Sequence, residues 1–212
     1  MKSKRLIIYG NGILLPVYVQ DISEATYIIG VDGAAHWLLT QGVVPDLAIG
    51  DFDSVTGKEF AVIKQKVKKV LQYPKDKDYT DMELAIDWAI KQSPARVVIY
   101  GGFGTRLDHS LVTVQMLEKF LKQGIPAVIR DSNNEAFLLT DKQKIPYIKK
   151  YRYLSLLPVT DSISVTLKGL VHSIKNEIIH RGQSLGISNE FTDKEATVEV
   201  HKGIVLVIRS RD

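Results

Sequence analysis

The sequence predicts an N-terminal α/β domain with a mainly parallel sheet, followed by a smaller C-terminal all-β sandwich domain. Two observations support this fold class. Short continuous apolar runs, several of them separated by helical patterns, occupy the first part of the chain. After about residue 140 the pattern changes to an alternation of apolar and polar residues with little helix. The chain has 212 residues, enough for two such domains, which we place at residues 1–139 and 140–212.

The apolar runs of the N-terminal part are typical of strands that are buried on both faces of a parallel sheet. They cover residues 6–9, 27–31, 47–49, 97–100 and 127–129. Each run is short and is followed within two residues by glycine or aspartate, which marks the point where a strand ends.

Two long helices are predicted between these strands. The first spans Thr80 to Gln92, where apolar residues recur at helical spacing and Thr80 with Glu83 forms a capping box. The second begins at Asp108 or His109 and ends at Gln123, before the sequence Gly-Ile-Pro.

Four alternating segments predict the strands of the C-terminal domain. They are residues 151–157, 163–167, 196–200 and 204–208. Turn sequences such as Lys168-Gly169 and Lys202-Gly203 separate them, as in antiparallel sheets.

Composition excludes several classes of protein. The chain has no cysteine, which rules out disulfides, thiolate zinc sites and cysteine nucleophiles, and indicates a reducing cytoplasm. The N-terminal apolar run is too short for a signal peptide or a membrane span, so we expect no membrane association. The net charge is +4, and the whole basic surplus lies in residues 140–212. Basic runs such as residues 64–69 lack interleaved aromatic residues and have the spacing of a solvated helix face, so we expect no nucleic-acid partner.

Glycine and aspartate follow the predicted parallel strands. The residues at these positions are Gly10-Asn11-Gly12, Asp32-Gly33, Gly50-Asp51, Gly101-Gly102 and Asp131. In an open parallel sheet the carboxyl ends of the strands form the ligand crevice, so these residues should meet at one edge. Glycine lets backbone N–H groups approach a phosphate, and aspartate holds a hard cation. The pattern predicts a site for a nucleotide and Mg²⁺.

The acidic residues of this edge are too many for ordinary turns. A single Gly-Asp after a strand is usually turn chemistry. Here Asp51 and Asp53 flank a phenylalanine, and Asp78 and Asp81 lie at a helix start. Clustered carboxylates repel one another and need a cation. Basic residues inside the acidic motifs, Lys77 and Arg106, are candidates for phosphate contacts.

These motifs resemble those of thiamine pyrophosphokinase, also called thiamine diphosphokinase, over nearly the whole chain. The Gly-Asp-Phe-Asp-Ser loop and the Lys-Asp-x-Thr-Asp segment are specific when taken together, whereas Leu-Leu-Pro-Val alone is weak. In order, the matching segments are Asp32-Gly33-Ala34, Gly50-Asp51-Phe52-Asp53-Ser54, Lys77-Asp78-Tyr79-Thr80-Asp81, Gly101-Gly102, Arg106-Leu107-Asp108-His109, Leu156-Leu157-Pro158-Val159 and Ser188-Asn189-Glu190-Phe191.

The resemblance implies transfer of the terminal pyrophosphate of ATP to the hydroxyl of thiamine, with release of AMP, by a homodimer whose site lies between subunits. It implies that Asp51, Asp53 and Asp81 bind magnesium and, with Asp108, form the catalytic set. Ser188 and Asn189 would contact the aminopyrimidine of thiamine, and Phe191 either offers it an aromatic face or belongs to the core of the β domain. The nucleotide-binding residues would be Asp32, Gly33, Lys77, Thr80, Gly102 and Arg106.

Other functions fit part of the pattern. A pyrophosphokinase for another alcohol, such as a hydroxymethylpterin, would share the acidic loops, and a metal-dependent sugar-nucleotide transferase would also use an Asp-x-Asp loop. A nucleotide-binding module without catalysis would need neither so many carboxylates nor a second domain.

Overall fold

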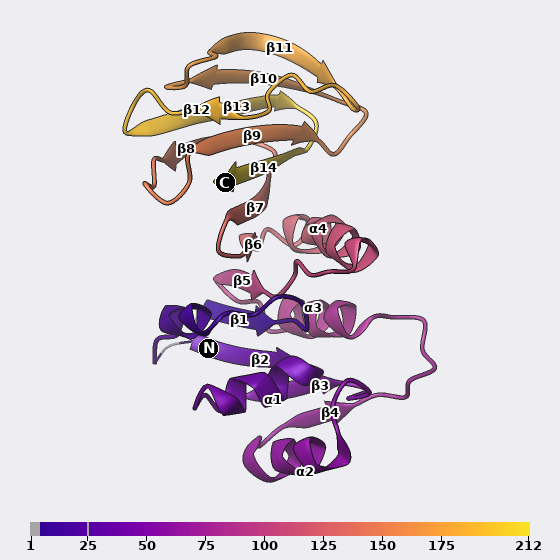
Figure 1. Ribbon diagram of the computed structural model, residues 1–212. Coiled ribbons are helices and arrows are strands. Elements are labelled where there is room, and N and C mark those ends of the chain that lie inside the picture. Colours follow the sequence, from indigo (N-terminus) through magenta and orange to yellow (C-terminus); the bar gives the residue numbers. More distant parts are fainter. Residues whose placement is uncertain (1–4, 25) are drawn as a thin grey trace. The chain divides into compact units, whose positions relative to one another are not determined.

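The computed structural model describes residues 5–24 and 26–212 (Figure 1). The chain forms two compact units, Met1–Asp131 and Ser132–Asp212. The first is an α/β unit and the second is built from antiparallel strands, which confirms the predicted fold class. No helix in the described ranges is long and apolar enough to span a membrane.

The sheet of the first unit has the strand order β6-β5-β1-β2-β3-β4, and every neighbouring pair is parallel. The strands are β1 (Arg5–Tyr9), β2 (Thr26–Val31), β3 (Leu47–Gly50), β4 (Val70–Gln72), β5 (Arg96–Tyr100) and β6 (Ala127–Arg130). Strands β2 to β4 extend the sheet on one side of β1, and β5 and β6 extend it on the other side. This reversal of strand order opens a crevice beyond the carboxyl ends of β1 and β5.

Helices connect these strands. They are the 3-10 helix η1 (Pro16–Asp21), α1 (Gly33–Thr40), α2 (Gly57–Lys66), α3 (Asp81–Lys91) and α4 (Leu107–Lys122). Helix α1 contacts α2, and α3 contacts α4. The side chains of β1, β3 and β5 are buried along nearly their whole length, as in a sheet that is covered on both faces. The two predicted long helices are confirmed as α3 and α4.

The start of α3 differs in one detail from the prediction. Thr80 is the N-cap, and its hydroxyl accepts a hydrogen bond from the Glu83 backbone N–H at 3.2 Å. The Glu83 carboxylate, however, binds the ammonium of Lys119 on α4 at 2.7 Å. The predicted capping box is therefore half formed, because Glu83 ties α3 to α4.

The second unit contains two groups of antiparallel strands. One has the order β12-β9-β14-β7 and the other has the order β11-β10-β13-β8. The apolar residues of β9, β10, β13 and β14 form one buried cluster with parts of their neighbours. The strands are β7 (Asn134–Leu139), β8 (Lys142–Pro146), β9 (Tyr153–Pro158), β10 (Ser162–Lys168), β11 (Ile174–His180), β12 (Asn189–Glu190), β13 (Glu195–Lys202) and β14 (Val205–Ser210).

The division between the units falls between Asp131 and Ser132, before the boundary that we expected between residues 139 and 140. The segment in between forms β7, which pairs with β14 over its whole length. Its partner strand therefore places β7 in the second unit.

Candidate nucleotide and metal site

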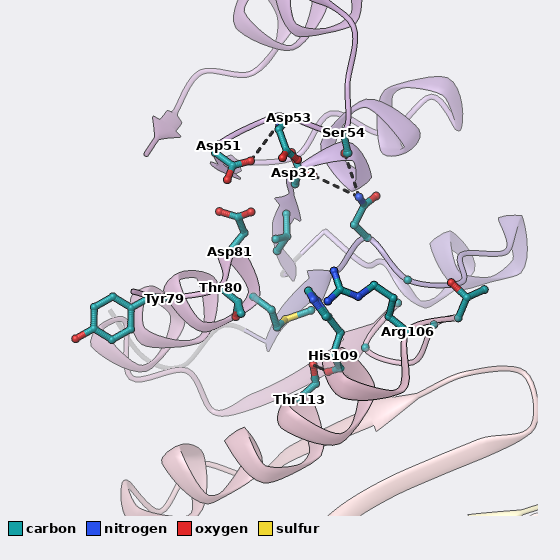
Figure 2. Close-up of a pocket in the computed structure, with 18 of the residues that line it drawn as sticks. Asp32, Asp51, Asp53, Ser54, Tyr79, Thr80, Asp81, Arg106, His109 and Thr113 are labelled. Carbon is teal, nitrogen blue, oxygen red and sulfur yellow. Dashed lines mark hydrogen bonds between the residues drawn. The ribbon is translucent and has the colours of Figure 1, made fainter. Parts of the chain in front are cut away.

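The carboxyl ends of β1, β2, β3 and β5 surround a cavity of about 570 Å³ in the first unit (Figure 2). Ten of the residues that line it are labelled in Figure 2. The wall also includes the glycines that follow β1 and β5. Of the predicted site residues, the cavity is lined by Asp32, Asp51, Asp53, Lys77, Thr80, Asp81, Gly102 and Arg106.

Asp32 lies in the turn between β2 and α1 and is only 6% exposed. Its Oδ2 accepts a hydrogen bond from the Asn11 side-chain amide at 3.3 Å, whereas its buried Oδ1 has no hydrogen-bond partner within residues 5–24 and 26–212. Burial raises the pKa of Asp32, and the charges of Asp51 and Asp53 add to this increase. The next residue, Gly33, has no room for a side chain, because an added Cβ would lie 2.8 Å from Asn11 Oδ1.

The loop after β3 brings two carboxylates to the same cavity. Asp51 Oδ1 accepts a hydrogen bond from the Asp53 backbone N–H at 3.1 Å. Phe52, between them, has a φ of 61° and is buried against Phe60 with ring centroids 4.6 Å apart. The buried ring directs the chain so that both neighbouring aspartates face the cavity (Figure 2).

Three carboxylates from these two loops could hold one cation. One ligand atom from each of Asp32, Asp51 and Asp53 lies within 4.8 Å of the other two. Oxygen donors of this type at this spacing suit Mg²⁺. The sequence-based expectation had Asp81 as the third ligand, whereas the structure brings Asp32 into the group.

Asp81, in the first turn of α3, points toward Asp51 (Figure 2). The Lys77 ammonium lies between them, 2.6 Å from Asp51 Oδ2 and 3.2 Å from Asp81 Oδ1. Burial alone would raise the pKa of Asp51, but the hydrogen bond from Lys77 lowers it below its ordinary value. Burial keeps the pKa of Asp81 above its ordinary value. We predicted from the sequence that Lys77 contacts phosphate. In the structure its ammonium contacts the carboxylates of Asp51 and Asp81.

Residues after β5 form the opposite wall. An added Cβ at Gly102 would lie 2.9 Å from Ile129, so the backbone packs directly on β6. Arg106 and His109, from the start of α4, both line the cavity. Asp108 pairs with Arg106 at 2.6 Å, with both side chains about two-thirds exposed, and is outside the cavity-lining set of the described residues. Asp108 therefore holds Arg106 in this structure.

The predicted thiamine-binding residues lie in the second unit. Ser188 is exposed, has a φ of 55°, and donates its backbone N–H to Ser155 Oγ at 2.9 Å. Asn189 is 2% exposed, and its amide exchanges hydrogen bonds of 3.0 and 2.8 Å with the backbone of His172. Asn189 thus fixes the loop, while the Ser188 side chain remains exposed. Phe191 packs against the core of this unit.

Two further polar side chains of the cavity, Asn11 and Lys75, had no role assigned from the sequence. Asn11 joins two loops, because its amide also donates to Ser54 Oγ at 3.0 Å. Lys75, which is largely exposed, pairs with Asp53 at 2.9 Å. The Gly-Asn-Gly sequence after β1 placed Asn11 at the predicted edge without a role, whereas Lys75 lies in a lysine-rich loop with no distinguishing signal.

Comparison with known proteins identifies the family. Residues 18–129 match the family model described as "Thiamin pyrophosphokinase, catalytic domain", and residues 142–205 match "Thiamin pyrophosphokinase, vitamin B1 binding domain". The chain belongs to the thiamine pyrophosphokinase family. Thiamine pyrophosphokinase from Bacillus subtilis is 35% identical over 214 residues, covering 100% of both chains. Thiamin pyrophosphokinase 1 from Caenorhabditis elegans is 24% identical over 199 residues, covering 88% of this chain and 80% of that protein.

Solved structures of this family have the same fold. The crystal structure of thiamine pyrophosphokinase from Bacillus subtilis has a TM-score of 0.92 at 35% identity and covers 99% of this chain and 100% of its own. The crystal structure of thiamin pyrophosphokinase from Geobacillus thermodenitrificans has a TM-score of 0.88 at 33% identity, covering 98% of both chains. The recognition of the family from its motifs is confirmed.

Proposed function

We propose that this chain transfers the pyrophosphoryl group of ATP to the hydroxyl of thiamine, giving thiamine diphosphate and AMP. The observation that carries this proposal is the group formed by Asp32, Asp51 and Asp53 beyond the carboxyl ends of the neighbouring parallel strands β2 and β3. Membership of the thiamine pyrophosphokinase family supports thiamine as acceptor and ATP as co-substrate.

The chemistry of phosphoryl transfer explains the residue types. The reaction needs positioning and charge neutralisation more than covalent participation by the protein. A bound Mg²⁺ would supply a Lewis acid that neutralises the phosphate oxygens. The residues that fit this ion are the three carboxylates, because the buried Oδ1 of Asp32 lacks a protein donor in the described ranges and a hard cation would satisfy it.

The residues around the metal ligands complete the binding of the phosphate chain. Arg106 lines the cavity and has several N–H donors for phosphate oxygens, and Asp108 holds its guanidinium. Gly102 lines the cavity and would contact the nucleotide, and Gly33 would contribute through the turn that holds Asp32. Thr80 caps the helix whose positive end faces the cavity. Ser188 would bind the aminopyrimidine, and Asn189 would hold the loop that carries it.

We also propose that the enzyme is a cytoplasmic homodimer with its site completed between subunits, as the family resemblance implies. Size-exclusion chromatography with light scattering measures the oligomeric state directly. A monomer at micromolar concentration that turns over thiamine would contradict it.

The function is tested by mixing purified protein, Mg²⁺, ATP and thiamine and analysing the products by mass spectrometry. We expect thiamine diphosphate and AMP in equal amounts. ADP with thiamine monophosphate would show a simple kinase instead. A parallel reaction with a hydroxymethylpterin tests the alternative acceptor, and pyrophosphorylation of the pterin alone would replace thiamine in the assignment.

A further inference from the structure

A second cavity, of about 490 Å³, lies in the second unit on the face of the β11-β10-β13-β8 sheet that is turned away from the buried cluster. Val165 and Leu167 of β10 belong to the buried cluster, whereas Thr166 between them and Lys168 line this outer-sheet cavity. Its lining residues and those of the acidic cavity in the first unit form two separate sets. Small-molecule sites have volumes of about 300 to 1,000 Å³, so the outer-sheet cavity has the size of a ligand site.

Irregular strand pairing on both sides of Thr166 shapes this cavity. On one side, the register with β11 places two residues, Lys175 and Asn176, opposite Thr166 alone. On the other side, the register with β13 shifts by one residue at His201. Asn176 has a φ of 50°, a left-handed conformation that asparagine tolerates better than most residues. Such bulges redirect side chains and are frequent beside functional sites, and here Asn176 and His201 both line the cavity.

Thr166 holds these two side chains in place. It is only 7% exposed, and its Oγ1 lies 2.8 Å from His201 Nε2. The same hydroxyl accepts a hydrogen bond from the Asn176 backbone N–H at 3.0 Å and lies 3.3 Å from Asn176 Oδ1. The side-chain NH2 of Asn176 has no hydrogen-bond partner within residues 5–24 and 26–212. The cavity therefore contains an oriented donor that the protein leaves unused.

The charged residues of the cavity add two ammonium groups. Lys168 and Lys175 are exposed, and neither forms an ion pair with a carboxylate in the part of the chain that the structure describes. Glu199 also lines the cavity, but its carboxylate pairs with Lys142 on β8 at 3.2 Å. The charges that remain available in the cavity are therefore positive.

We infer that the outer-sheet cavity is a binding site for a small phosphate-bearing anion, either inorganic phosphate or a phosphate monoester. Lys168 and Lys175 neutralise the phosphate, and the Asn176 amide donates a hydrogen bond to one of its oxygens. A phosphate monoester carries a charge of about −2 at neutral pH, which two ammonium groups balance. The volume of the cavity leaves room for an organic group attached to the phosphate.

This inference does not depend on the reaction of the acidic cavity, so it is tested without ATP, thiamine or Mg²⁺. The full-length protein is labelled with carbon-13 in the histidine rings, and inorganic phosphate or glycerol phosphate is added at constant pH and ionic strength. His201 lines the outer-sheet cavity and His109 lines the acidic cavity, so their NMR signals report on the two sites separately. Each signal is assigned by its loss in His201→Gln or His109→Gln. We expect the His201 signal to shift and to reach saturation.

Matched lysine variants locate the bound anion. Lys168→Met combined with Lys175→Met should weaken binding about tenfold or more, because each substitution removes a charged partner of the phosphate. Lys149→Met combined with Lys194→Met is the control, since it removes the same charge from exposed lysines of the second unit that are outside the described set lining the cavity. The control should change the affinity by no more than about threefold, because solvent screens distant charges. Circular dichroism confirms that each variant is folded.

Tighter binding of glycerol phosphate than of inorganic phosphate identifies a phosphate monoester as the ligand, whereas equal or weaker binding identifies the inorganic ion. The absence of a saturable His201 shift with both probes would overturn the inference. So would an equal shift with uncharged glycerol, or equal affinities of the two double-lysine variants. A protein that binds phosphate at this site but makes no thiamine diphosphate would contradict only the proposed function. An active enzyme whose His201 signal does not respond would contradict only this inference.

Discussion

Gly50 lies directly against the backbone of Asp32, at the point where β3 and β2 end. A Cβ added at Gly50 would be 3.2 Å from the Asp32 backbone N and Cα, and Gly50 itself has a φ of 155°, a region that side chains rarely adopt. This close approach joins the two loops that carry the carboxylates Asp32 and Asp51.

Gly50→Ala should therefore disturb fold and site together. We expect a loss of about 2 kcal/mol in the free energy of unfolding from backbone strain, measured by urea denaturation. Mn²⁺ affinity should fall as well, because the added methyl group moves one loop away from the other. Gly57→Ala is the control, since an added Cβ there meets nothing within 4 Å. Equal stability of the two variants would show that the contact is unimportant.

Asp53→Asn should lower kcat by about a hundredfold or more, because the site loses a carboxylate that neutralises phosphate charge through magnesium. Its side chain is 46% exposed, so the fold should be unaffected. Asp78→Asn changes an exposed acid of the neighbouring motif that is outside the cavity-lining set, and it should retain activity. Steady-state kinetics decide the matter, and comparable rates for both variants would refute the metal role of Asp53.

Ser188→Ala should raise the KM for thiamine more than the KM for ATP, because the exposed hydroxyl is assigned to the acceptor. Asn189→Ala should act on stability instead. Its amide is buried and hydrogen-bonded to both the backbone N–H and the backbone C=O of His172, so we expect a loss of about 2 kcal/mol in the free energy of unfolding. Equal changes in both KM values for Ser188→Ala would remove it from the thiamine site.

Asp21 provides a pH-dependent test of stability away from the cavity. It accepts a hydrogen bond from the Tyr100 hydroxyl at 2.8 Å and pairs with Arg5 and Arg130. Burial raises the pKa of Asp21, but these partners outweigh it and lower the pKa below the usual 3.8. The folded chain therefore binds fewer protons than the unfolded chain, and the stabilisation, present above pH 3.8, is lost as the pH falls through the lowered pKa.

Asp21→Asn should accordingly cost about 2 kcal/mol at neutral pH. The difference from the natural protein should shrink below pH 3.8. Urea denaturation over a pH series measures it, and a difference that stays constant with pH would contradict the assigned ion pairs.

The strands that the sequence predicted are the ones that carry most of the core. The apolar runs at β1, β3 and β5 are buried on both faces, so their composition alone reveals them. Strands such as β11 are exposed along most of their length, and β8 has one buried residue. These segments are strands because β11 pairs with β10 and β8 pairs with β13. Such pairing leaves no pattern in the local sequence.

The candidate site was predictable to the extent that it depends on strand ends. Asp32 and Asp51 directly follow parallel strands, so their convergence follows from the sheet. The choice of Asp32 over Asp81 as a neighbour of Asp53 depends on loop conformation, including a φ of 50° at Asp32. The position of Lys77 between two carboxylates depends on the path of a loop without regular structure, which the sequence does not determine locally.

The most direct test of the proposed transfer is a reaction with ATP labelled at the β-phosphorus, in the presence of Mg²⁺ and thiamine. If the terminal pyrophosphoryl group moves as one unit, the label appears in thiamine diphosphate from the first turnover and the released AMP is unlabelled. Label retained in ADP, with thiamine monophosphate as the first product, would contradict the account.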